Sequence, residues 1–462
     1  MSAHEFSAPA RVTARRRASQ PSRVIVRAWD MGLLLVANVV LVIGLWLRSG
    51  GLPASGSGGD VLTSIGRITG LIGTLLVLVQ LLLIARLPVL ERSVGFDRLT
   101  VWHRRNGRIA LILLLVHAVL ITIGYALRGR VSLPGEVKTL LLSTPGILTA
   151  TAGTLLLVAV VVTSLVIARR RLRYETWYFV HLYSYLGIAL AFSHQLAVGT
   201  SFIGDGVAQA YWWTLYGVTL GALVLFRLLV PFARNMRHGL RVQRVVQEGP
   251  GVVSLYITGR HLDRLGARAG QFFLWRFLTK DSWWQSHPFS LSAAPDGRQL
   301  RITVKALGDF TERIGTIAPG TRVFAEGPFG HFTAATQRRR GVALIGGGVG
   351  ITPIRGLVEE LAPGSDIAIV YRVVDAQDAV LLHELHDIAA PRGSRVHLIA
   401  GDHRDPAARR LLSPEHLREL VPDIARRDVY LCGPPAMADA TEASLHAVGV
   451  PGASIHTERF AF

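Results

Sequence analysis

Four histidines in the apolar N-terminal half of this sequence have the chemistry and the spacing of haem ligands. They are His103, His117, His181 and His194, and the first 237 residues contain one other histidine, His4. The four form two pairs, 14 and 13 residues apart, on two separate hydrophobic segments. Because a helix rises about 1.5 Å per residue, the members of a pair lie about 20 Å apart along it. Ionisable residues in membrane segments are functional-site candidates. Two such helices can hold two haems, each iron bound by one imidazole from each helix.

Hydrogen bonding between helices is the alternative explanation for these histidines. It suits a single histidine, but four histidines at matched depths on parallel helices favour haem ligation. Two axial imidazoles leave the iron no open position, which is typical of electron transfer rather than ligand chemistry. Nearby, Gly107 and Gly187 either admit a flat porphyrin or serve helix packing.

The spacing within each pair sets a geometric condition. A straight helix returns to within about 40° of the same face after 14 residues, but after 13 it lies about 140° away. We therefore expect a π-bulge or a kink between His181 and His194, and such bulges are frequent at functional sites.

The composition indicates a membrane protein with soluble domains. The chain has 462 residues, of which 50% are hydrophobic, and a mean hydropathy of +0.37. That is long enough for two or three domains. A single cysteine excludes an internal disulfide and any all-cysteine metal site. The net charge of +19 comes from arginines at the ends of membrane segments, without basic runs interleaved with aromatics, so nucleic-acid binding is not expected.

Six segments have about the 20 residues needed to cross a bilayer. They are 29–48, 64–86, 102–126, 145–168, 175–197 and 209–230. Arginines cluster in the N-terminal tail, after the second and fourth spans and after the sixth, which places both termini in the cytoplasm. The connection 128–143 is an exception to this pattern. His103 and His181 then lie at the inner level, and His117 and His194 at the outer level.

The pattern changes at about Met236. Short alternating runs at 252–258, 271–277, 300–304 and 322–325 predict a small antiparallel barrel. From Gly341 onward, strands alternate with helices, which predicts a doubly wound α/β domain. We therefore divide the chain into a basic tail (1–28), a six-helix transmembrane haem domain (29–232), a barrel domain (236–335) and a nucleotide-binding domain (340–462).

A glycine-rich loop follows the first strand of the last domain. It includes Gly346, Gly347, Gly348, Gly350 and Thr352. Such a loop alone is weak evidence for nucleotide binding, because some glycine-rich loops are ordinary turns. Between a strand and a helix, it favours a dinucleotide pyrophosphate at the helix N-terminus.

Further motifs occur in a fixed order around this loop. They are His287-Pro288-Phe289-Ser290, Val304-Lys305, Gly308-Asp309-Phe310-Thr311, Glu326-Gly327-Pro328-Phe329-Gly330, Cys432-Gly433-Pro434-Pro435-Ala436-Met437 and Glu458-Arg459-Phe460. Together they make residues 238–462 resemble the ferredoxin–NADP reductase superfamily, whose members bind FAD on the barrel and NAD(P)H on the α/β domain.

That resemblance implies roles for the barrel motifs. His287 matches the residue that contacts the flavin phosphates, Phe289 the aromatic packed against the isoalloxazine, and Ser290 the hydroxyl near flavin N5. Pro288 and Lys305 belong to the same FAD-binding motifs. Gly308 and Thr311 match the helix start that receives the FAD pyrophosphate.

The resemblance also assigns the nicotinamide side. The glycine loop holds the dinucleotide, and Cys432, Gly433 and Pro434 lie near the nicotinamide. Phe460 matches the aromatic that covers the flavin, with Phe462 as the weaker candidate. Arg372, at the end of the second strand of this domain, favours NADPH through the 2′-phosphate, and Arg404 is a second candidate for that contact. Asp375 keeps NADH possible.

The whole chain apart from the tail resembles the NADPH oxidase and ferric reductase superfamily. The histidine spacings of 14 and 13 are similar to those of NADPH oxidases, and Arg67 matches an arginine beside the oxygen-reducing site. A haem propionate or a position at the membrane interface explains Arg67 equally well. Ile121 departs from animal members, which carry a histidine there. The resemblance implies FAD, two b-type haems and NADPH, in a bacterial cytoplasmic membrane protein with no obligatory protein partner.

Three functions remain open. The first is an NADPH oxidase that reduces dioxygen to superoxide or peroxide outside the membrane. The second is a reductase of ferric or other metal chelates with the same electron path. The third is an electron-transfer module that serves a partner protein.

Overall fold

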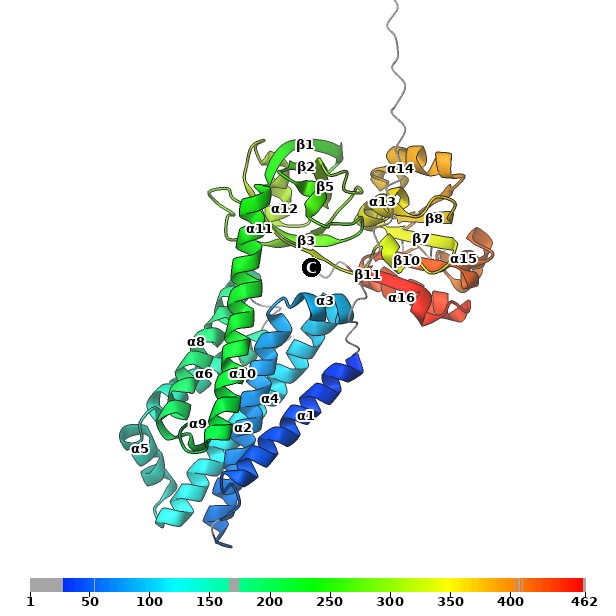
Figure 1. Ribbon diagram of the computed structural model, residues 1–462. Coiled ribbons are helices and arrows are strands. Elements are labelled where there is room, and N and C mark those ends of the chain that lie inside the picture. The colour runs from blue at the N-terminus through cyan, green and yellow to red at the C-terminus, as the bar shows by residue number, and fades with distance from the viewer. Residues whose placement is uncertain are drawn as a thin grey trace, which may run out of the picture.

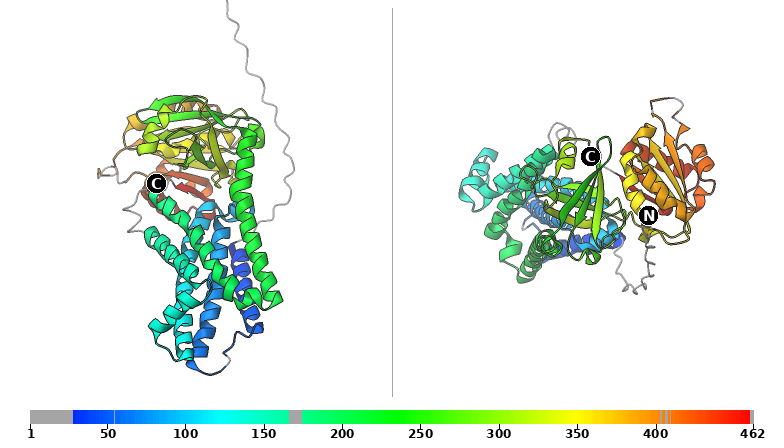
Figure 2. Two further views of the ribbon diagram at one scale, coloured as in Figure 1. Left: turned by 90° about the vertical axis from the view of Figure 1, so that its left-hand side faces the viewer. Right: turned by 90° about the horizontal axis from the view of Figure 1, so that it is seen from above.

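The computed structural model describes residues 28–53, 55–165, 174–402, 404–405, 408 and 410–459. The predicted tail, the arginines at 169–173 and the two C-terminal phenylalanines, Phe460 and Phe462, lie outside these residues. A bundle of long helices forms one part of the molecule, and the barrel and the α/β domain lie side by side at one end of it (Figures 1 and 2).

The bundle consists of long spans joined by short helices. They are α1 (Ala28–Arg48), α2 (Gly58–Ile84), α3 (Pro88–Val94), α4 (Phe96–Gly129), α5 (Leu133–Ser143), α6 (Ile147–Ser164), α8 (Tyr174–Val198), α9 (Thr200–Ile203), α10 (Gly206–Ala222), the π-helix η1 (Leu223–Leu229) and α11 (Val230–His238). Within the described ranges, five helices are long and apolar enough to cross a membrane. The remaining predicted span is α8, which is more polar because it carries two histidines and Gln195.

Glycines bring the spans into close contact. A Cβ at Gly66 of α2 would lie 3.1 Å from the Ile121 side chain of α4, and one at Gly153 of α6 would lie 2.5 Å from the carbonyl oxygen of Gly187 on α8. Small residues let membrane helices approach in this way. A Cβ at Gly107 would meet the Gln80 side chain of α2 at 2.7 Å. Gly107 and Gly187 therefore serve helix packing.

The barrel domain is built from two antiparallel three-stranded sheets. One has the order β1 (Arg241–Gly249), β2 (Val252–Thr258), β5 (Gln299–Lys305), and the other β4 (His287–Ser290), β3 (Phe272–Phe277), β6 (Val323–Phe329). Isolated bridges, Arg241–Arg322 and Leu291–Ile302, join their edges. Leu255, Ile257 and Trp275 are fully buried between them. The short helix α12 (Asp309–Arg313) follows β5.

The nucleotide domain has a parallel five-stranded sheet. Its order is β11 (Ile455–Arg459), β10 (Asp428–Gly433), β7 (Gly341–Gly347), β8 (Asp366–Val373), β9 (Arg395–Ala400). Side chains of α13 (Ile351–Glu360) and α14 (Leu382–Ala389) pack on one face, and those of α15 (Pro414–Leu420) and α16 (Pro435–Ala447) on the other. The strand order reverses between β7 and β10, where doubly wound sheets bind ligands at the carboxyl ends of their strands.

The last span connects the bundle to the barrel as one helical rod. It runs from Gly206 to His238 through α10, η1 and α11 (Figure 1). At its end, the Asn235 amide donates to the Ala325 carbonyl and accepts from the Ala325 amide, at 2.9 and 2.8 Å. Arg234 donates to the Gly327 carbonyl at 3.0 Å. Strand β6 is therefore attached to the rod.

A buried arginine forms the second connection. The Arg86 guanidinium lies over the rings of Phe96 and Phe329, 4.9 and 4.5 Å from their centres. It is also 3.9 Å from a Glu91 carboxylate oxygen and 3.8 Å from one of Glu326 on β6. Burial raises the pKa of Glu91 to about 7 against the opposing effect of Arg86. These contacts join α2 and α3 to the barrel.

Replacing Gly153 with alanine should push α6 away from α8, because the new Cβ would collide with backbone atoms of Gly187 and Ala191. Overpacking of this kind costs about 1–3 kcal/mol. The thermal midpoint of purified protein in detergent should fall. Gly217→Ala on α10 is the matched control, since its Cβ would meet nothing within 4 Å. Equal midpoints for the two variants would show that α6 and α8 tolerate a wider spacing.

Glu91→Gln should flatten the dependence of stability on pH. The pKa of Glu91 is about 7 in the folded chain against 4.5 ordinarily, so its burial costs nothing below pH 4.5 and progressively more up to about pH 7. The wild-type thermal midpoint should therefore drop further between pH 5 and pH 8 than that of the variant. Glu419→Gln, at an exposed position, controls for loss of a charge. Parallel curves for wild type and Glu91→Gln would contradict the assignment.

Candidate functional site

Helices α4 and α8 bring the four histidines together as two pairs. The ring centres of His103 and His181 are 6.1 Å apart, and those of His117 and His194 are 6.3 Å apart. These are the pairs expected from the orientation of the spans. An imidazole nitrogen binds a transition metal at about 2 Å, and the ring centre lies roughly 1 Å behind it, so one iron between two rings requires centres about 6 Å apart. Both separations fit one iron.

Hydrogen bonds orient all four rings. The Nδ1 atoms of His103 and His117 donate to the carbonyls of Gln80 and Gly66 on α2, at 3.3 and 2.7 Å. Those of His194 and His181 lie against the Ala191 carbonyl and the Ser164 hydroxyl. A carbonyl can only accept, so Nδ1 of His103, His117 and His194 carries a proton, and in the neutral ring the lone pair is then on Nε2. This is the usual arrangement around metal-binding histidines.

The residues of α2 that support these rings were not found from the sequence. A Cβ at Gly70 would lie 2.5 Å from Nδ1 of His117, so the ring rests directly on the α2 backbone. The Gln80 amide nitrogen lies 3.1 Å from Nε2 of His103, where it satisfies the lone pair that an iron would use. Gln80 therefore has to turn aside when a metal binds there.

The expected bulge between His181 and His194 is absent. Helix α8 is a regular α-helix from Tyr174 to Val198, and the π-helix lies in the last span instead. If the offset of roughly 140° between His181 and His194 is divided equally, each of these residues points about 70° away from the direction of α4. Histidine side chains span that angle by choice of rotamer, so the prediction of a bulge was wrong.

Arg67 lies at the depth of the outer pair. It follows Gly66, whose carbonyl accepts from His117, and its side chain is half-buried. Ile121 of α4 packs against Gly66 one turn beyond His117. The role of Arg67 at the outer end stays a prediction.

Strand β4 and helix α12 bring the barrel motifs to one place. The rings of His287 and Phe310 are stacked, with centres 3.9 Å apart and planes at 12°. At the start of α12, the Thr311 hydroxyl accepts from the amides of Leu307 and Gly308, at 2.8 and 3.0 Å. A Cβ at Gly308 would meet nothing within 4 Å, so there is open space in front of this helix start for a phosphate group.

The remaining barrel residues lie on β4 and at the end of β5. Ser290 ends β4 and is 5% exposed, while Pro288 is exposed and Phe289 is half-buried. The Trp275 indole donates to the Phe289 carbonyl at 2.9 Å, which fixes the backbone of β4. Lys305 is the last residue of β5, directly before the α12 motif. The arrangement suits a flavin along β4 with its phosphates near α12.

The glycine loop and the cysteine motif form one site at the carboxyl ends of β7 and β10. A Cβ at Gly350 would lie 2.3 Å from the Cys432 carbonyl oxygen, and one at Gly347 would lie 3.3 Å from Pro434. Gly348 has a φ of +54° and open space around its Cα. Only glycine allows this approach. Burial raises the pKa of the Cys432 thiol, which is fully buried in the core of this domain, so it stays protonated.

The loop continues into α13 and faces the Cys432 motif across its remaining positions. Gly346 pairs with Cys432 in the sheet, and Thr352 in the first turn of α13 is 2% exposed. A Cβ at Gly433 would lie 3.3 Å from backbone atoms of Gly347. A dinucleotide at this helix start therefore has Cys432 and Gly433 as its neighbours.

The residues proposed to distinguish NADPH from NADH surround the end of β8. The Arg372 guanidinium donates to the carbonyls of Val373 and Gly401. Arg404 is exposed, and the Asp375 carboxylate accepts from the Gln377 amide at 3.0 Å. The preference for NADPH stays a prediction.

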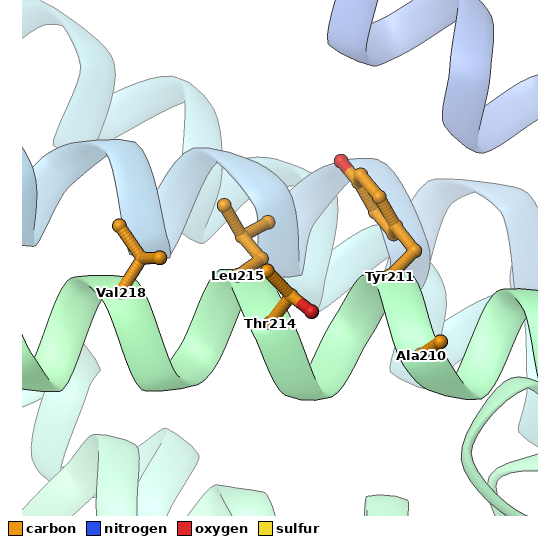
Figure 3. Close-up of a pocket in the computed structure, with 5 residues that line it drawn as sticks. All are labelled: Ala210, Tyr211, Thr214, Leu215 and Val218. Atoms are coloured by element: carbon orange, nitrogen blue, oxygen red, sulfur yellow. The ribbon is translucent and has the colours of Figure 1, made fainter.

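An apolar pocket on the last span is separate from these sites. It is lined by Ala210, Tyr211, Thr214, Leu215 and Val218, all on α10 (Figure 3). The Tyr211 hydroxyl donates to Asn38 of α1 at 3.1 Å. The pocket brings no further ligand to the histidine pairs.

Family comparisons divide the chain in the same way. Residues 69–192 match the family described as ferric reductase like transmembrane component, residues 249–333 an FAD-binding domain, and residues 344–443 an oxidoreductase NAD-binding domain.

Individual relatives match parts of the chain. A flavohemoprotein of Vibrio cholerae is 32% identical over 183 residues, which are 37% of this chain and 45% of that protein. Ferric reduction oxidase 7, chloroplastic, of Arabidopsis thaliana is 26% identical over 319 residues, which are 63% of this chain and 39% of that protein. The chain thus spans less than half the length of either relative.

Among solved structures, the FAD/NAD-binding domain of a nitric oxide dioxygenase from Vibrio cholerae covers 48% of this chain, with 24% identity and a TM-score of 0.40, and is itself covered to 99%. The three matched domains occur here in the order transmembrane, FAD-binding, NAD-binding. The chain therefore has the domain architecture of the NADPH oxidase and ferric reductase superfamily.

Proposed function

We propose that this protein transfers electrons from NADPH on the cytoplasmic side of a bacterial membrane to dioxygen on the outer side, where superoxide forms. The proposal depends on the two histidine pairs between α4 and α8, because the separation of the rings in each pair fits one iron between them. Phe96 of α4 contacts Phe272 of β3, and Phe179 of α8 contacts Trp284, so the barrel lies at the end of the bundle nearer to His103 and His181.

Two b-type haems are the groups that the histidines suit. His103 and His181 would bind the inner one, and His117 and His194 the outer one. The chemistry that the cofactors supply when bound is hydride acceptance at the flavin and one-electron transfer at the haem irons. The chain contributes Nε2 lone pairs that its Nδ1 hydrogen bonds orient, in a setting of apolar helices.

The soluble residues bind and orient the substrates. His287, stacked on Phe310, and the start of α12 would hold the FAD phosphates, while Ser290 would stand at the reacting edge of the flavin. The glycine loop would receive the dinucleotide, and Arg372 the 2′-phosphate. The buried Cys432 thiol stays protonated and would not act as a nucleophile.

The outer acceptor site would include Arg67. A cation at the depth of the outer pair attracts an anionic product such as superoxide. Both termini would lie in the cytoplasm, and the apolar side chains exposed on the spans, such as Leu33, Leu155 and Leu220, would contact lipid. No obligatory protein partner is proposed.

Ferric chelate reduction is the second candidate function. The match to ferric reduction oxidase 7, which covers 63% of this chain, favours it. The electron path would be the same, and only the outer acceptor would differ. An electron-transfer module for a partner protein would reduce neither acceptor.

An absorption spectrum distinguishes these functions. Purified protein supplied with haem and FAD should show reduced low-spin b-haem bands after anaerobic NADPH. Rapid loss of the bands in air, with superoxide, would support the oxidase. Slow loss in air with rapid loss on adding a ferric chelate would support the reductase. Folded, haem-supplied protein without such bands would refute haem ligation.

His194→Ala should remove the outer haem and leave the inner one. The variant should contain roughly one haem per chain instead of roughly two, because one axial imidazole is lost from the outer site. NADPH should still reduce its flavin, while acceptor reduction falls to background. His383→Ala, at an exposed position far along the chain, serves as control. Undiminished acceptor reduction by His194→Ala would rule out the path.

A further inference from the structure

One carboxylate lies between two buried arginines from different domains. The Glu384 carboxylate on α14 accepts hydrogen bonds from both Nη atoms of Arg301 on β5 of the barrel, each at 2.8 Å. It also accepts from Arg355 on α13 of the nucleotide domain. The Arg301 and Arg355 side chains are 5% and 7% exposed, and that of Glu384 is 33% exposed. The carboxylate thus bridges the seam between the two domains.

The charges of this cluster balance only when Glu384 is ionised. Arg355 also pairs with Glu359 at 2.6 Å, which gives two guanidinium groups and two carboxylates. Burial disfavours the Glu384 carboxylate, but the hydrogen bonds and charges of the arginines outweigh it and hold its pKa below the ordinary value. Without that carboxylate, Arg355 would keep Glu359, but Arg301 would lose the carboxylate that it binds, and an uncompensated buried charge is costly.

The cluster reaches both reacting sites. Arg301 Nε donates to the Ser292 hydroxyl at 3.2 Å, and Ser292 follows Ser290 by two residues. Arg355 lies on the helix that begins directly after the glycine loop. From the same helix, Glu359 accepts from the Ala294 amide at 2.7 Å. A continuous chain of polar contacts therefore connects the end of β4 to the helix that carries the dinucleotide loop.

We propose that Glu384 is a positioning residue for hydride transfer. By binding Arg301 and Arg355 together, it fixes the glycine loop at a set distance from Ser290 and so aligns the nicotinamide with the flavin. The proposal rests on the proposed functions of these two sites. Misplacement of reacting groups by about 1 Å can cost roughly 100-fold in rate.

The neighbours of Glu384 provide matched controls. His383 and Asp387, on the same helix, pair with each other at 3.1 Å, and their side chains are 94% and 65% exposed. Asp387→Asn removes a carboxylate from α14 by the same chemical change as Glu384→Gln, without touching either arginine.

The test is anaerobic stopped-flow reduction of the flavin by NADPH in the full-length holoprotein. In Glu384→Gln, the limiting rate per bound flavin should fall about 30- to 100-fold, while the apparent dissociation constant of NADPH changes less than about threefold. The primary isotope effect with NADPH deuterated at C4 should be fully expressed. Transfer from chemically reduced flavin to haem should be unchanged, and Asp387→Asn should match wild type.

A second variant covers the case in which Glu384→Gln loses FAD or does not fold. Glu384→Asp keeps the charge but is one methylene shorter, so it cannot reach both arginines, and its limiting rate should fall about 3- to 10-fold. Wild-type rates per bound flavin in the folded variants would overturn the positioning role. If wild-type protein itself accepts no hydride from NADPH or NADH, the proposed function fails instead.

Discussion

Keeping four neutral imidazoles at set depths inside apolar helices is the constraint on which the rest of the bundle depends. Each ring must present Nε2 to its partner, so each Nδ1–H needs an acceptor where no water is available. Helix α2 supplies two of those acceptors, the carbonyls of Gly66 and Gln80. It can do so because its glycines let it lie against α4 at backbone distance. Helices α4 and α8, which carry the histidines, thus depend on a neighbour, α2, that carries none of the four.

Shared polar contacts also hold the soluble half to the bundle. Asn235 satisfies both backbone groups of Ala325 at the edge of β6, and Arg86 lies between aromatic rings of α4 and β6. Aromatic contacts cross the same junction: Phe96 of α4 lies against Phe272 and Phe329 of the barrel, and Phe179 of α8 lies against Trp284. Directional polar contacts and ring contacts together therefore locate the barrel on the bundle.

Periodic and contiguous patterns were readable from the sequence, whereas contacts between distant segments were not. The spans, the histidine pairs and the glycine loop follow from local spacing and appear in the structure at the expected places, whereas the roles of the FAD motifs came from a family resemblance. The contacts of Gln80 with His103, of Arg86 with Glu326 and of Glu384 with Arg301 carry no local signal, since they span 23, 240 and 83 residues. The prediction of a bulge in α8 was wrong because the angle per residue of a straight helix takes no account of how far a histidine side chain can turn.

The helical rod from Gly206 to His238 has a consequence for how such a chain can change in evolution. Because the rod is continuous and enters the barrel without a hinge, each residue added or removed upstream of Asn235 would turn the whole soluble half by about 100° and shift it by about 1.5 Å. The loops between the other spans impose no such coupling. The number of residues in the last span thus determines the angle at which the soluble half is attached to the bundle. The extra residue accommodated by the π-helical turn at Leu223–Leu229 contributes to that angle.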